Sequence, residues 1–79
     1  MTKTHDRLQL QVNNSGAWKT VLHYNAASRR DDGRARKAAL LLNRSDPASG
    51  WRIATDEPHP RVLHRLDGDT HGAWRVEQV

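Results

Sequence analysis

The chain has 79 residues and a formal net charge of +4, contains no Cys and no Phe, and is 35% hydrophobic. This length is enough for one domain with a thin core, and the lack of Cys excludes disulfides and thiolate zinc sites. No segment reaches the ~18 apolar residues of a membrane span, and the N-terminus lacks the apolar run of a signal peptide. We therefore expect a soluble cytoplasmic protein that forms a single domain over residues 1–79, with residues 1–6 disordered.

The first two predicted elements form a β-hairpin. Residues 7–12 alternate apolar and polar side chains, which predicts a half-buried strand with its leucines and valine on one side. Turn-forming residues follow at 13–16. Residues 17–24 then return to an extended pattern rich in aromatic and β-branched side chains, with Trp18 expected to face inward.

A helix is predicted over residues 31–45. Either Ser28 or Asp31 is suited to cap its N-terminus, where acidic residues also favour the positive end of the helix dipole. Most of the residues that follow are good helix formers. Pro47 ends the helix because it disfavours helical backbone geometry at the residue before it.

Three more strands are predicted after the helix, over residues 50–55, 61–66 and 73–79, with polar turns at 56–60 and 67–72. The element order is therefore ββαβββ, an α+β fold in which one α-helix packs on an antiparallel β-sheet. The side chains expected to face the helix are Leu8, Leu10, Val12, Trp51, Ile53, Trp74 and Val76, and Val62, His64 and Leu66 are expected to share one face of their strand.

The excess positive charge is concentrated in the helical segment. Residues 28–45 hold six basic and two acidic residues, whereas the two kinds balance in the rest of the chain. Successive helical residues are about 100° apart, so the stripe expected to face the sheet is Ala35, Ala38, Ala39 and Leu42. The side chains expected on the opposite face are Arg36, Lys37, Leu40 and Arg44. That face is either an ordinary solvated surface with one exposed leucine or a contact patch with an apolar centre and a cationic rim.

Two further groups of side chains are candidate partner contacts. Arg29 and Arg30 precede the predicted helix and extend its cationic surface. Asp56, Glu57 and His59 lie in a turn made rigid by two prolines, and exposed turns of this kind often carry recognition residues.

Motifs for catalysis, metal binding and phosphate binding are missing from the sequence, which has no glycine-rich phosphate loop, no H-E-x-x-H and no G-x-S-x-G. His64 alternates with apolar residues in a predicted strand, which favours a packed histidine over a ligand. The 67–72 turn starts like a calcium loop but lacks the later ligands. We therefore expect no catalytic residue, no metal and no cofactor, and a protein that is not an enzyme.

Two classes of partner remain open. Proteins that bind nucleic acid combine a basic surface with aromatic side chains that stack on bases, but residues 25–50 contain no Trp or Tyr. We therefore expect a protein partner that has an acidic surface, or one whose nucleic-acid site the cationic side of the helix would block. The alternative is a small DNA- or RNA-binding regulator that places its helix in the major groove. A homodimer is also open, and no membrane partner is expected.

The stretch GWRIATDEPHPRVLHRL at residues 50–66 resembles sequences of small phage and prophage accessory proteins, and the Cys-free chain with its ββαβββ order resembles the anti-CRISPR proteins among them. The resemblance spans residues 8–78 in size and element order. It implies a non-enzymatic viral inhibitor that occludes part of a bacterial defence complex in the host cytoplasm. Members of this group share no common site, so no residue roles are carried over. The net positive charge departs from acidic members that mimic DNA and favours an acidic protein surface as the target.

Overall fold

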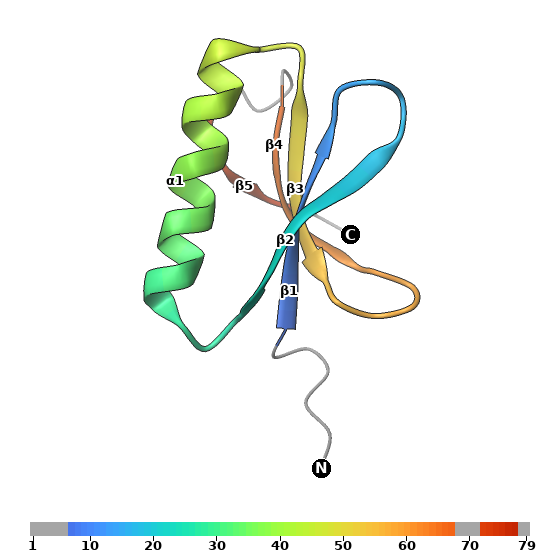
Figure 1. The fold of residues 1–79 in the computed structure, drawn as a ribbon, viewed down its shortest axis with the longest axis vertical. Coiled ribbons are helices and arrows are strands. Elements are labelled where there is room, and N and C mark those ends of the chain that lie inside the picture. Colours follow the sequence, from blue (N-terminus) through green and yellow to red (C-terminus); the bar gives the residue numbers. More distant parts are fainter. Residues whose placement is uncertain (1–6, 68–71, 78–79) are drawn as a thin grey trace.

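A computed structural model describes residues 7–67 and 72–77. The elements follow in the order β1 (Arg7–Asn13), β2 (Trp18–Asn25), α1 (Arg29–Ser45), β3 (Gly50–Thr55), β4 (Val62–Leu66) and β5 (Arg75–Val76). The strands form one antiparallel sheet in the order β2-β1-β3-β4-β5, and α1 lies along one face of it (Figure 1). The predicted fold class is confirmed. The predicted disorder of residues 1–6, and residues 68–71 of the predicted polar turn, lie outside the described residues.

The N-terminal hairpin forms as predicted, with Gly16 at its turn. Gly16 has a φ of 93°, a conformation that favours glycine, and its amide donates to Oδ1 of Asn13 at 2.9 Å. The β1–β2 register shifts between Leu10 and Gln11. β1 then pairs with β3 on its other edge, so the first strand of the chain lies near the middle of the sheet.

Helix α1 begins at Arg29 because Ser28, and not Asp31, is its N-cap. Oγ of Ser28 accepts a hydrogen bond from the amide of Asp31 at 3.2 Å, which satisfies one of the free amides at the start of the helix. At the other end, the amide of Asp46 donates to the carbonyl of Leu42 at 3.0 Å. The helix thus ends directly before Pro47, as predicted.

The core lies between α1 and the sheet. Small side chains on the buried side of the helix allow it to approach the strands closely. The buried hydrophobic cluster consists of Leu8, Leu10, Tyr24, Ala35, Ala39, Trp51, Ile53 and Leu66, with Val12, Leu40, Leu63 and Trp74 partly buried against it. Burial was predicted for six side chains: it is confirmed for Leu8, Leu10, Trp51 and Ile53, whereas Val12 and Trp74 are only partly buried. No helix in the described part of the chain is long and apolar enough to cross a membrane.

Three side chains differ from their predicted orientation: Trp18 and Val76 were expected to face inward, and Val62 was expected to share a face with His64. The β3–β4 register shifts between Ile53 and Ala54, so Val62 pairs with Ala54 and leaves the face that His64 occupies. Val76 is 62% exposed because β5 is only two residues long at the edge of the sheet. Trp18 is 38% exposed and contacts Arg52 on the face turned away from α1. Alternation alone could not reveal these differences, because register shifts and edge positions depend on the partner strand.

Candidate binding surfaces

Two of the four side chains predicted to lie on the outward face of α1 do not lie there. Leu40 packs against the core cluster. Arg36 is half-buried: its Nε donates to Oδ2 of Asp32 at 2.8 Å, and its guanidinium carbon lies 5.7 Å from the centroid of the Trp74 ring. The indole N–H of Trp74 also donates to the carbonyl of Arg36 at 3.0 Å. Arg36 therefore connects the segment that contains Trp74 to the helix.

A polar residue explains the different orientation of the helix. Asn43 is buried, and its Nδ2 donates to the carbonyl of Ser49 at 2.9 Å. The stripe that faces the sheet is therefore Ala35, Ala39 and Asn43. The sequence-based assignment instead used apolar character alone, which placed Leu42 inward and Leu40 outward.

We call the outward side of α1 the cationic face. It consists of the exposed side chains Arg30, Arg34, Lys37, Leu41 and Arg44. Steps of four and three residues align these positions along one side of the helix. Leu41 is 53% exposed and Leu42 beside it is 52% exposed. Among the described residues, the four cations of this face form no ion pair. Lys37 and Arg44 were predicted to lie here, and they do.

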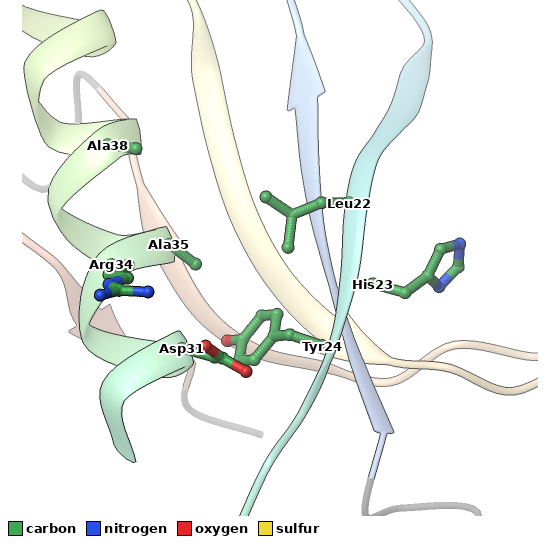
Figure 2. Close-up of a pocket in the computed structure, with 7 residues that line it drawn as sticks. All are labelled: Leu22, His23, Tyr24, Asp31, Arg34, Ala35 and Ala38. Carbon is green, nitrogen blue, oxygen red and sulfur yellow. The ribbon is translucent and has the colours of Figure 1, made fainter. Parts of the chain in front are cut away.

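An open hollow of about 370 Å³ lies between α1 and β2, next to the cationic face. Figure 2 shows Leu22 and Tyr24 of β2 facing Ala35 of the helix across the hollow, while His23 points away from it. Ala38 also lines the hollow and lies one helical turn before Leu41. The exposed leucines of α1 are therefore continuous with an apolar hollow.

Tyr24 ties the start of α1 to β2. Its hydroxyl donates to Oδ1 of Asp32 at 2.7 Å. Burial of the phenol, followed by this hydrogen bond, raises the pKa of Tyr24 above its ordinary value. Asp32 also accepts from Arg36, so one carboxylate links β2, the first turn of α1 and the contact with Trp74.

The remaining predicted contacts are scattered. Arg29 and Arg30 are exposed in the first turn of α1. Asp56 directly follows β3. The Oδ2 atom of its carboxylate is 3.4 Å from Nε of Arg7 and 3.2 Å from Nδ1 of His23. Glu57 is half-buried and His59 is exposed. Their roles as partner contacts stay predictions.

The face of the sheet turned away from α1 carries a hydrogen-bonded network that the sequence did not reveal. We call this face of the sheet the open face. Thr20 Oγ1 donates to Oε1 of Gln9 at 2.7 Å, and Gln9 Nε2 donates to the carbonyl of Thr55 at 2.9 Å. Gln11 Nε2 donates to both Gln9 and Thr20, at 3.4 and 3.3 Å. Both glutamines are buried, although their alternation with leucine predicted solvent contact.

Arg52 lies at the end of this network. Its Nε donates to Oε1 of Gln11 at 2.6 Å, and its guanidinium carbon lies 4.1 Å from the centroid of the Trp18 ring. Partial burial lowers the pKa of Arg52, but a guanidinium keeps its charge at any physiological pH. Among the described residues Arg52 has no carboxylate partner. The two contacts therefore hold a charged group in a defined orientation.

His64 is half-buried on the face under α1, directly opposite Ile53. Burial, followed by the charge of Arg36, lowers its pKa, so the neutral form is favoured. Within residues 7–67 and 72–77, no group of three or more side chains that commonly bind metals is close enough to hold an ion.

Neither the comparison with protein-family models nor the searches of curated proteins and of solved structures finds a match for this chain.

Proposed function

We propose that the chain is a non-enzymatic binding protein that inhibits a larger complex by covering one of its surfaces, with the cationic face of α1 as the contact. The observation that carries the proposal is the exposure of Leu41 and Leu42, 53% and 52%, beside four cations that lack ion-pair partners among the described residues. A patch with an apolar centre and a charged rim is the usual anatomy of a protein interface.

The charge of the rim selects the class of partner. Arg30, Arg34 and Arg44 offer planar guanidinium groups that bind carboxylates with two parallel hydrogen bonds. A protein surface with an apolar cleft and acidic margins would complement both parts of the patch. The hollow beside β2 adds apolar area into which a partner side chain can insert. Leu41, which lies between Lys37 and Arg44 on this face, is the side chain expected to contribute most to the affinity.

The resemblance to anti-CRISPR proteins directs the proposal to a bacterial defence complex of the CRISPR-Cas type. In that setting the chain is a viral protein that acts in the host cytoplasm. It blocks an acidic protein surface of the effector or the entrance to its nucleic-acid site. Such an inhibitor works stoichiometrically, because each copy must occupy one copy of the target.

The test is titration of a purified CRISPR-type effector complex with the protein, with target DNA cleavage as the readout. We expect inhibition that is complete at a fixed molar ratio and does not increase with time. Inhibition by far less than one chain per complex would contradict the proposal, because it requires turnover. A lack of inhibition across representative effector types would contradict the choice of target.

Two single variants test the contact surface. Leu41→Ala should weaken inhibition by about tenfold, the effect of losing a central apolar contact, and should leave stability nearly unchanged. Leu40→Ala is the matched control, since it removes the same atoms one position away. Because Leu40 packs on the core, this variant should lose about 2 kcal/mol of stability, while its folded fraction inhibits normally. The opposite pattern would show that the contact lies elsewhere.

A charge reversal tests the rim. The variant with Arg34→Glu, Lys37→Glu and Arg44→Glu should fold, because these side chains are exposed and form no ion pair in the described part of the chain. It should lose inhibition, since like charges then face each other across the interface. Retained inhibition would identify the cationic face as an ordinary solvated surface.

A further inference from the structure

A row of arginines crosses the open face of the sheet. Arg52 of β3 pairs with Arg65 of β4, and Arg65 pairs with Arg75 of β5, so the three side chains stand on one face of neighbouring strands. We call these residues the arginine row. Adjacent strands are about 4.8 Å apart, and like charges directly opposite each other destabilise a sheet. An arrangement that opposes stability invites a functional explanation.

The three arginines of the row differ in whether they form ion pairs. Arg65 lies 3.6 Å from the carboxylate of Asp67 and 3.1 Å from that of Glu77. Arg52 and Arg75 form no ion pair within the described ranges. Arg52 is instead oriented by Gln11 and Trp18. Arg52 and Arg75, without an ion pair in the described part of the chain, therefore lie on either side of Arg65, which pairs with two carboxylates.

A small hollow adjoins the row and combines several recognition groups. It measures about 210 Å³ and is lined by Trp18, Arg52, Val62, Arg65, Asp67 and Glu77. Sites that enclose a whole small molecule usually start at about 300 Å³, so this one fits a single planar group. An aromatic ring, hydrogen-bond donors and hydrogen-bond acceptors therefore meet in one place.

We propose that the open face binds single-stranded nucleic acid, with an unpaired base in the hollow beside Trp18 and backbone phosphates on Arg52 and Arg75. A base carries both donors and acceptors on its edge, which complements the guanidinium and carboxylate groups of the hollow. Its flat face stacks on aromatic side chains and on guanidinium planes. Phosphates are natural ligands of the two uncompensated arginines.

The acidic side chains in the hollow discriminate against an acidic peptide. A peptide carboxylate offers only acceptors and would be repelled by Asp67 and Glu77, whereas a base can donate to these groups. A duplex is also disfavoured, because its bases are stacked and cannot enter the hollow. The inference does not rest on the proposed function, since α1 covers the other face of the sheet (Figure 1).

The test measures binding of the full-length protein to a fluorescent single-stranded RNA of about ten nucleotides. Arg75→Gln should weaken binding by about threefold or more, and Trp18→Leu by about tenfold. Arg75 is exposed on the last strand, so its variant remains informative if Trp18→Leu fails to fold. Lys37→Gln on α1 is the matched control, with the same charge change on the other side of the molecule, and should bind within about twofold of the wild type.

The salt dependence sharpens the test. Two phosphate contacts to a single strand predict a slope of about −1.4 in a plot of log affinity against log salt, and Arg75→Gln should reduce it to about −0.7. The inference is overturned if Lys37→Gln weakens binding as much as Arg75→Gln, or if a duplex of the same sequence binds as tightly. It is also overturned if polyglutamate competes as well as unlabelled RNA, since the ligand would then be an acidic protein.

Discussion

The two faces of the sheet bury their side chains by different means. Under α1, Leu10, Ile53 and Leu66 are buried by apolar packing, which has no preferred direction. On the open face, Gln9 and Gln11 are also buried, but each is held by hydrogen bonds. The difference shows how a chain with a small apolar fraction gains order on both sides of a sheet. It also explains why Arg52 and Trp18 have defined positions without a second hydrophobic core.

The largest expected effect concerns the covered face. Trp51→Ala should cost roughly 3–5 kcal/mol, the usual range for a buried aromatic side chain. Trp51 is 5% exposed, and its indole N–H donates to Oγ of Ser49 at 3.0 Å. A domain this small has little stability in reserve, so thermal denaturation should show a largely unfolded variant at room temperature. An unchanged melting temperature would show that Trp51 does not contribute to the core.

A smaller effect is expected on the open face. Gln9→Met keeps the volume of the side chain but removes its bonds with Thr20 and Thr55. We expect a loss of about 2 kcal/mol, since buried groups are left without partners. Urea denaturation gives the value. Gln9→Met as stable as the wild type would mean that apolar burial alone orders this face, and the contrast between the two faces would then disappear.

The smallest effect tests the polar contact at the border of the covered face. Tyr24→Phe removes the hydrogen bond to Asp32 and should cost about 1 kcal/mol at neutral pH. Because the folded state raises the pKa of Tyr24 above 10.0, this contribution is complete below about pH 10 and is lost as pH rises further. Urea midpoints of the two proteins should therefore converge at alkaline pH. A constant difference across that range would contradict the role of the phenol proton.

Local patterns predicted the elements well. The alternation in residues 7–12, the good helix formers after Ser28 and the stop at Pro47 all correspond to elements in the structure. These signals succeed because backbone geometry and burial of one face act over a few neighbouring residues.

The candidate sites were harder to predict because they depend on contacts between distant segments. The orientation of α1 depends on the bond from Asn43 to Ser49, which hydrophobic periodicity cannot anticipate. The arginine row unites residues 52, 65 and 75 through strand pairing. In sequence these arginines lie outside the segment with excess charge, so nothing marked them as a group.

Because β5 is short, the C-terminal segment can separate from the rest of the sheet. Only Arg75 and Val76 belong to this strand. Beyond their pairing, the segment is held by the bond from the Glu77 amide to Leu63, the ion pair of the Glu77 carboxylate with Arg65, and the contacts of the Trp74 indole with Arg36. Such a segment can detach as a separate unit while the rest stays folded. In native-state hydrogen exchange, the amide of Glu77 should therefore exchange well before the amides of β1 and β3. Each such opening would carry Arg75 away from Arg65 and would remove Trp74 from its contact with the core cluster, while β1 and β3 stay paired.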